Sequence, residues 1–214
     1  VTMPDTSLPR YQTPAPIAAP TEVIEAAVDL LTEADWPLIF GGRIGYKEEA
    51  TQPMIDLVET LGAAYQDGHD IICMPSNHPQ NLNASFGRTK AEGEYKKMLL
   101  GKADTIFCLD CLDISNNVGS YEGARGAGIA VEDKPKKIID LSLNDFAIQH
   151  WTNIGGPLPP VDVQIQADNL YGLNQIREAL HRRAEGNPAW TKRAAERRAE
   201  IGDMHNALRK QQKD

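Results

Sequence analysis

The sequence predicts an α/β fold: a doubly wound parallel sheet of about five to six strands with helices on both faces. Two observations predict it. Short segments that are almost wholly apolar alternate along the chain with segments whose apolar residues recur at helical spacing. Strands of such composition are buried on both faces, which is typical of parallel sheets. Right-handed crossovers then bring the loops that follow the strands to one edge, where ligands of such folds bind.

The first third of the chain predicts a helix, a strand and a second helix. Thr21 is expected to cap a helix that runs to about Ala34, and the apolar run 36–40 predicts a buried strand. A tight glycine-rich turn, 41–45, follows this strand. The next helix is predicted to end at Gly62 in the left-handed conformation. Its buried stripe comprises Met54, Leu57, Val58 and Leu61.

The remainder predicts four strands and two helices. Residues 63–66 form a weak candidate strand, and a long irregular stretch leads to about residue 87. A third helix is expected to close at Gly101, before an apolar strand at 105–109. Residues 110–135 are glycine-rich and predict a loop-rich insertion. The last predicted strands are 138–141 and 161–165, followed by a helix marked by Leu173, Ile176 and Leu180.

Composition is that of a soluble globular protein. The 214 residues are 41% hydrophobic and 24% charged, and no apolar run approaches the roughly 18–20 residues that span a bilayer. Three cysteines provide no disulfide framework and fit a reducing compartment. We therefore expect a cytoplasmic location and no membrane partner.

Charge is unevenly distributed. The net charge is −8, yet residues 181–214 carry nine Lys and Arg against five Asp and Glu, which leaves −12 on residues 1–180. Such a balance argues against a nucleic-acid partner. The basic, alanine-rich tail predicts a solvated helix or linker, with an anionic-partner patch as the alternative.

Three segments are predicted. Residues 1–20 contain five prolines and predict an extended interdomain linker; residues 21–185 form the α/β domain; residues 186–214 form a basic helical linker or tail. Because a linker opens the chain, we expect it to be an excised piece of a longer polypeptide or a chain trimmed at its start.

The turn Gly41-Gly42-Arg43-Ile44-Gly45 has the position of a phosphate-cradling loop, because glycines let the backbone approach an anion. The full G-x-G-x-x-G fingerprint is missing, and the nearest acidic candidate for a ribose, Asp67, lies just beyond the second strand. Both a nucleotide contact and a turn that serves only the fold remain open.

The cysteines and one histidine are the other candidates. Cys108-Leu109-Asp110-Cys111 has C-x-x-C spacing, but its first cysteine falls inside a predicted buried strand. We therefore interpret these cysteines as small core residues rather than as a zinc or redox site. His78, in a loop among asparagines, is a candidate ligand contact or a structural residue.

Taken in order, these features resemble the central domain of thiamine-diphosphate-dependent enzymes of the acetolactate synthase and benzoylformate decarboxylase type. The resemblance covers roughly residues 18–185. The flanks are similar too, with a proline-bearing linker before and a charged helix with Trp190 after. Its motifs are Trp36-Pro-Leu-Ile-Phe-Gly-Gly42, Leu61-Gly62, Asn77-His-Pro79, Lys102–Leu109, Lys137–Asn144 and Val161–Asp168.

The resemblance implies a Rossmann-like fold of the DHS-like NAD/FAD-binding type in a parent enzyme that decarboxylates or joins 2-oxo acids. Thiamine diphosphate and Mg²⁺ would be held by the pyrimidine-binding and diphosphate-binding domains, the partners of this chain, and the parent would be a homo-oligomer. Gly202-Asp203-Met204 is not the family's metal motif, so the chain itself is expected to contain no catalytic residue.

Some family members bind FAD or ADP in this domain. Here Asp110-Cys111 replaces the usual glycine after the fourth strand, and Ser142 and Asn144 replace two aspartates. An Asp110 without a compensating cation would repel a pyrophosphate. If a nucleotide binds, the expected contacts are Gly41, Gly42, Arg43, Gly45, His78 and Asn144.

Two other functions compete with a central domain that joins its neighbours. A free-standing nucleotide-binding oxidoreductase is suggested by the strand, glycine turn and helix. A nucleotide-free interaction module is suggested by the replaced glycine and aspartates.

Overall fold

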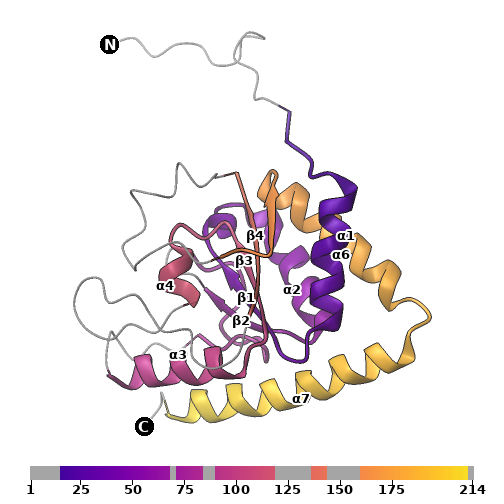
Figure 1. Ribbon diagram of the computed structural model, residues 1–214. Coiled ribbons are helices and arrows are strands. Elements are labelled where there is room, and N and C mark those ends of the chain that lie inside the picture. Colours follow the sequence, from indigo (N-terminus) through magenta and orange to yellow (C-terminus); the bar gives the residue numbers. More distant parts are fainter. Residues whose placement is uncertain (1–14, 68–70, 84–89, 119–135, 144–159, 212–214) are drawn as a thin grey trace, which may run out of the picture.

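A computed structural model of the chain describes residues 15–67, 71–83, 90–118, 136–143 and 160–211 (Figure 1). Its centre is a five-stranded parallel sheet in the order β2-β1-β3-β4-β5. The strands are β1 (Pro37–Gly41), β2 (Ala64–Asp67), β3 (Thr105–Leu109), β4 (Lys137–Ser142) and β5 (Val163–Gln166). The predicted doubly wound sheet is therefore confirmed.

A short segment around Asn81 pairs with β2 at the edge of the sheet. The Tyr65 N–H donates to Gln80 O at 2.9 Å and the Leu82 N–H donates to Tyr65 O at 2.8 Å, which makes one parallel bridge between Tyr65 and Asn81. If this segment is counted as the third strand along the chain, the spatial order of the six strands is 3-2-1-4-5-6, as in dinucleotide-binding folds.

Helices cover both faces of the sheet (Figure 1). On one face lie α1 (Thr21–Glu33), α2 (Thr51–Leu61) and α6 (Asn169–Ala184), and on the other lie α3 (Lys90–Lys102) and α4 (Ile114–Val118). Two short 3₁₀ turns, η2 (Arg43–Tyr46) and η3 (Glu48–Ala50), connect β1 to α2. None of the described helices is long and apolar enough to cross a membrane.

Two apolar cores result from the alternation of side chains along each strand. Ile39 and Phe107 point into the core beneath α1, α2 and α6, whereas Leu38 and Ile106 point into the core beneath α3 and α4. All of β1 and β3 is buried, because both lie inside the sheet. This is why these strands are continuous apolar runs in the sequence.

The basic tail forms α7 (Pro188–Gln211), which lies across the end of the sheet where the strands begin (Figure 1). Its Trp190 belongs to the first core and its Ile201 to the second, so the helix connects the two. A fully solvated helix was therefore the wrong expectation for this segment. The buried stripe comprises Trp190, Ala194, Arg197, Ile201, His205 and Leu208.

Arginines of α7 bind the carboxyl ends of α1 and α2. Arg197 Nη1 donates to Ala34 O at 2.9 Å, and its Nη2 donates to Leu61 O. Arg193 donates to Thr32 O at 3.2 Å, and Arg198 donates to Glu59 O at 3.1 Å. Cations at helix carboxyl ends satisfy free carbonyls and oppose the helix dipole. The arginines of the tail thus bind backbone carbonyls of the same chain.

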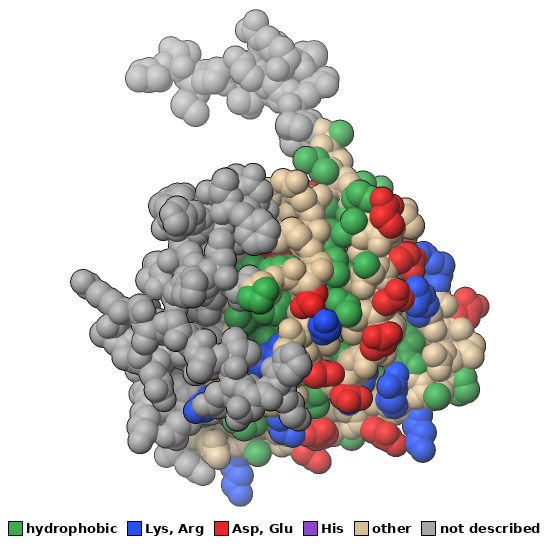
Figure 2. Space-filling model, in the orientation of Figure 1, with side chains coloured by type: hydrophobic (Ala, Val, Ile, Leu, Met, Phe, Trp, Pro, Cys, Tyr) green, Lys and Arg blue, Asp and Glu red, His purple; other side chains and the backbone are tan. Residues whose placement is uncertain are grey.

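Acidic and basic side chains also lie side by side over α1, α6 and α7 (Figure 2). Glu25 of α1 accepts from Arg182 and Arg183 of α6, and Asp29 accepts from Arg183 at 2.7 Å. These pairs are largely exposed, so each stabilises the fold by only about 0–1 kcal/mol.

The lead-in segment before α1 is held against α6. Ala19 N–H donates to Gln175 Oε1 at 3.0 Å, and Gln175 Nε2 returns a bond to Ala19 O at 3.1 Å. Ile17 O accepts from the Asp168 N–H at 2.8 Å. The chain therefore enters the domain at the edge of the sheet where the strands end.

Local details differ from expectation at three places. Pro20, not Thr21, precedes the first turn of α1, and no side chain caps it. Helix α3 continues through Gly101 to Lys102. Helix α4 lies within the segment predicted to be loop. It was missed because a helix of 5 residues is too short to show helical periodicity in the sequence. The rest of that segment, 119–135, lies outside the described residues.

Candidate functional site

The glycine turn lies at the carboxyl edge of the sheet, between β1 and β3, where the strand order changes direction. In doubly wound folds the loops diverge at this point and leave a crevice for a ligand. The sequence-based expectation placed Gly41, Gly42, Arg43 and Gly45 here, and the structure has them here. Their contacts determine what the crevice can hold.

The backbone of the turn is bonded to β3 and its loop. The Gly42 N–H donates to Leu109 O at 2.8 Å and the Arg43 N–H donates to Asp110 O at 3.1 Å. A Cβ added to Gly42 would lie only 2.6 Å from the Asp110 carbonyl carbon. Glycine is thus needed here for a close approach to the protein's own backbone, and the two N–H groups that follow β1 are occupied.

The charged side chain of the turn is also paired within the protein. Arg43 Nη2 lies 2.6 Å from Asp110 Oδ1, and the Asp110 side chain is 8% exposed. Burial raises the pKa of the Asp110 carboxyl, and bonds from Arg43 and Asn169 offset part of this effect. The expectation of an uncompensated Asp110 was wrong, because Arg43 neutralises it. The two residues are 67 positions apart, so no local spacing could have revealed the pair.

The other two glycines also face protein atoms. A Cβ on Gly41 would meet the Tyr65 ring at 2.9 Å, and a Cβ on Gly45 would meet Ile72 O at 2.9 Å. The Tyr65 hydroxyl donates to Asp67 Oδ1 at 2.6 Å, and burial raises the pKa of Tyr65 well above its ordinary value. Both glycines therefore permit close internal packing.

Asp67, the nearest acidic candidate for a ribose, is in register with Gly41 at the end of β2. Both of its carboxylate oxygens have protein partners. Oδ1 accepts from Tyr65 and, at 3.4 Å, from the Cys73 N–H, and Oδ2 accepts from Asn83 Nδ2. Burial raises the pKa of Asp67, although these bonds oppose the rise.

The raised pKa of Asp67 predicts a pH effect on stability. Between pH 3.8, its ordinary pKa, and the higher pKa of the folded state, the native protein binds more protons than the unfolded chain. The contribution of Asp67 should therefore be most favourable below pH 3.8 and fall as the pH rises through this window. Comparing urea unfolding of the wild type and Asp67→Asn from about pH 2 to about pH 7 measures it.

Asp168→Asn is the matched control for this measurement. Burial alone would raise the pKa of Asp168, but the bonds from Lys47 and the Tyr171 N–H outweigh it and lower the pKa. Its contribution is lost as the pH falls through the lowered pKa, so the difference from wild type should have the opposite slope. Equal slopes for the two variants would contradict the assignment.

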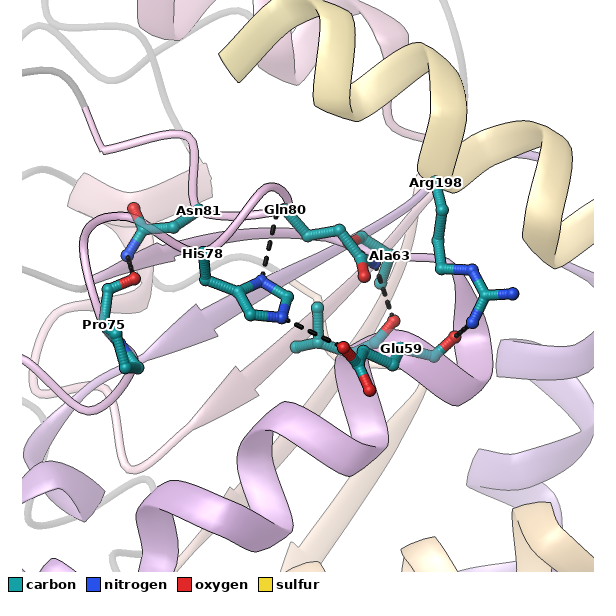
Figure 3. Close-up of polar contacts among 8 residues, drawn as sticks. Glu59, Ala63, Pro75, His78, Gln80, Asn81 and Arg198 are labelled. Atoms are coloured by element: carbon teal, nitrogen blue, oxygen red, sulfur yellow. Dashed lines mark hydrogen bonds and ion pairs between the residues drawn. The ribbon is translucent and has the colours of Figure 1, made fainter. Parts of the chain in front are cut away.

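His78 lies at the other end of the sheet. Helix α2 runs back from the carboxyl edge, so Glu59 in its last turn lies near the starts of the strands. His78 Nε2 is 3.3 Å from Glu59 Oε1, and His78 Nδ1 accepts from the Gln80 N–H at 3.2 Å (Figure 3). The structure does not bring His78 to the glycine turn; its contacts are with the protein itself.

Gln80 and Asn81, beside His78, satisfy backbone carbonyls (Figure 3). Gln80 Nε2 donates to Val58 O at 2.9 Å and to Ala63 O at 2.8 Å. Asn81 Nδ2 donates to Met74 O at 3.1 Å and to Pro75 O at 3.2 Å. Gln80 thus fastens the loop to the end of α2, and Asn81 closes the loop on itself.

Asn144, the remaining expected contact, lies outside the described residues. Ser142, two positions earlier, is buried at the end of β4, and its hydroxyl donates to Asp140 Oδ2 at 3.2 Å. Besides the Arg43–Asp110 pair, sequence reasoning missed the pair of Lys47 and Asp168 at this edge, whose Nζ and Oδ2 are 2.8 Å apart.

The cysteines are buried, as the core interpretation expected. Cys108 and Cys111 are fully inaccessible, and Cys111 Sγ lies 3.7 Å from Phe40 O. A bond with Cys111 and burial both raise the pKa of Cys108, and burial raises that of Cys73 to about 11. Among the described residues, no three or more His, Cys, Asp or Glu side chains are grouped to hold a metal ion.

The sequence matches no protein-family model and no curated protein. Solved structures, however, share the fold. Benzoylformate decarboxylase from Polynucleobacter necessarius is 16% identical with a TM-score of 0.54, over 83% of this chain and 30% of that chain. A protein from Mycobacterium smegmatis described as a thiamin diphosphate-dependent enzyme is 15% identical with a TM-score of 0.56, over 78% and 29%.

The thiamine diphosphate-dependent 4-hydroxybenzoylformate decarboxylase of Rhodococcus jostii RHA1 is 16% identical with a TM-score of 0.52, over 79% of this chain and 28% of that chain. The chain thus spans less than a third of the length of these structures. At such identities the likeness establishes a common fold.

Proposed function

We propose that this chain is the non-catalytic central domain of a thiamine-diphosphate-dependent enzyme that decarboxylates or joins 2-oxo acids. The observation that carries the proposal is the pattern of coverage: two structures named for this cofactor and one benzoylformate decarboxylase share the fold over about four fifths of this chain. The motif order of the sequence, from Trp36 to Asp168, supports the same family.

The partners of the chain in this proposal are the pyrimidine-binding and diphosphate-binding domains of the parent, which would hold thiamine diphosphate and Mg²⁺. The cofactor supplies a carbanion and an electron sink to the parent. We therefore assign this chain no step of the reaction.

A joining role fits the positions of the two ends. The lead-in segment is bonded to α6 at the carboxyl edge through Ile17 and Ala19, whereas α7 lies across the amino edge (Figure 1). Flanking domains would then attach at opposite ends of a rigid α/β body. This supports a spacer that fixes the distance between its neighbours.

FAD and ADP do not fit the described carboxyl edge. The N–H groups of Gly42 and Arg43 donate to β3 and its loop, and the Arg43–Asp110 pair occupies the switch point. A phosphate would have to displace these bonds and face the Asp110 carboxylate. We therefore favour a nucleotide-free structural domain over a nucleotide-binding oxidoreductase.

This predicts that FAD, ADP and NAD leave the thermal midpoint of the purified chain unchanged. A functional site at 100 times its Kd would add about 2.7 kcal/mol and raise the midpoint by about 5–10 °C in a domain of this size. Thermal-shift titrations measure this directly. A rise of that size with FAD or ADP alone would contradict this proposal.

The family assignment is tested on the native polypeptide. An antibody raised against this chain should detect a protein about three times as long in extracts of the organism that makes it. That protein should release CO₂ from a 2-oxo acid only when thiamine diphosphate and Mg²⁺ are supplied. A native product of 23.5 kDa, or hydride transfer by the isolated chain, would refute the proposal.

A further inference from the structure

Residues 71–83 run from the carboxyl edge of the sheet to the amino edge and back, and we call them the edge segment. It begins beside the glycine turn, because a Cβ on Gly45 would lie 2.8 Å from Ile71 Cγ2. Its last residue, Asn83, accepts from the Asp67 N–H at 2.7 Å and donates to Asp67 Oδ2. Both ends of the edge segment therefore contact the carboxyl edge.

Helix α7 holds the middle of the edge segment at the amino edge. Arg209 Nη2 donates to Ser76 O at 2.7 Å, and His205 Nδ1 donates to Asn81 O at 2.7 Å. His205 and Arg209 are four positions apart and therefore lie on one face of the helix. His205 is 6% exposed and Asn81 is fully buried, so water does not compete for the bond between them.

The edge segment has little backbone pairing with the sheet itself. In the part of the chain that the structure describes, it forms one bridge with β2, between Tyr65 and Asn81. By contrast, β1 and β3 pair along all five residues of each strand. Sparsely bonded elements open at a lower free energy than strands in the middle of a sheet. The edge segment therefore depends on the neighbouring helices for its position.

The end of α2 is a second place where the edge segment and α7 meet. Gln80 of the edge segment donates to Val58 O at 2.9 Å and to Ala63 O at 2.8 Å. Between these two carbonyls along the chain, Leu61 O accepts from Arg197 of α7. Departure of α7 would thus remove a donor from the same helix end that anchors the edge segment, in addition to its direct bonds.

From these shared attachments we propose that α7 and the edge segment form one cooperative unit, which opens and closes while the five-stranded sheet stays folded. Helix α7 contributes no strand, so it can leave without breaking any strand pairing. Opening breaks the bonds at Ser76 and Asn81 and, at the other end of the segment, releases the contacts with Gly45 and Asp67. A displacement of α7 is thereby transmitted to the glycine turn at the opposite edge.

The proposal concerns this chain alone and does not depend on the thiamine diphosphate assignment. Amide hydrogen exchange of the 214-residue chain in low concentrations of urea tests it. The Leu82 N–H, which donates to Tyr65 O, reports opening of the edge segment. We expect Leu82 and the amides of α7 to share one protection factor and one urea dependence, and the amides of β3 to be protected at least about tenfold more.

The variant Ala194→Gly loosens α7 at a distance from the edge segment. Ala194 is buried on the face of α7 that meets Gly62, and it lies roughly 16 Å along the helix from His205. Loss of its methyl group should accelerate exchange at Leu82 and in α7 by at least about fourfold, the equivalent of about 0.8 kcal/mol. Exchange in β3 should accelerate as well, because global unfolding also breaks this contact.

Ala27→Gly is the matched control, since it removes the same methyl group from a fully buried alanine of α1. It should accelerate exchange in β3 but leave Leu82 and α7 within about twofold of the wild type, because α1 stays folded when the unit opens. An unchanged rate at Leu82 in Ala194→Gly would overturn the proposal, since the edge segment would then open without α7. Equal acceleration of Leu82 by both variants would overturn it too, because Leu82 would then exchange only through global unfolding.

Discussion

Replacing Gly62 by alanine is expected to lower the free energy of unfolding by about 3 kcal/mol. Gly62 ends α2 with φ +62°, a conformation that costs an L-residue about 1–2 kcal/mol. The backbone of α7 leaves no room for a side chain here, because an added Cβ would lie 2.8 Å from the Ala194 Cα. Backbone cannot move aside as a side chain can, so overpacking adds about 1–3 kcal/mol. Urea or thermal unfolding measures the loss.

Gly186→Ala separates the two causes. Gly186 also has a positive φ, +73°, but an added Cβ would meet nothing within 4 Å. This control should lose only the conformational part, about 1 kcal/mol. Equal losses in the two variants would show that α7 does not press on Gly62.

Replacing Arg197 by methionine should cost about 3 kcal/mol. The guanidinium is buried and donates to Ala34 O and Leu61 O at the ends of α1 and α2. Burial is the main cause that lowers the pKa of Arg197. Methionine fills much of the same space but leaves both carbonyls without a donor, at about 1–3 kcal/mol each. The loss is partly offset because no charge is then buried.

Arg198→Met is the comparison for this prediction. Arg198 makes one exposed bond, to Glu59 O at 3.1 Å, and water can replace it. We expect a loss below about 0.5 kcal/mol. Arg197→Lys keeps the charge but not the two-pronged guanidinium, so its loss of unfolding free energy should lie between those of Arg197→Met and Arg198→Met. If Arg197→Met were as mild as Arg198→Met, the helix ends would not depend on the buried cation.

The fold could be predicted because its signals are local. Strand 105–109 was predicted with the bounds that β3 has, and Gly62 was predicted in the left-handed conformation it adopts. Both depend on a few neighbouring residues: an apolar run buried on both faces, and a glycine after a helical stripe. The apolar positions of α7 were harder to read, because Arg197 and His205 occupy its buried stripe.

The position of the glycine turn was predicted from the sequence, but the contacts of the turn were not. Gly42 was expected at the switch point and is there, yet what approaches it is the Asp110 backbone. A glycine that accommodates a phosphate and one that accommodates a neighbouring chain look the same in a sequence. The pairing of Arg43 with Asp110 joins residues far apart in the chain, and His78 was assigned to the turn although the topology separates them.

Helix α7 also constrains the order in which this polypeptide matures during synthesis. The carbonyls of Ala34 and Leu61 cannot bind Arg197 until it has left the ribosome, more than a hundred residues later. At about 5–20 residues per second, the nascent chain spends roughly 7–33 s before α7 can bond these helix ends and connect the two cores. A chain cut at the predicted boundary, residue 185, would stay in that state, with hydrophobic surface available to chaperones.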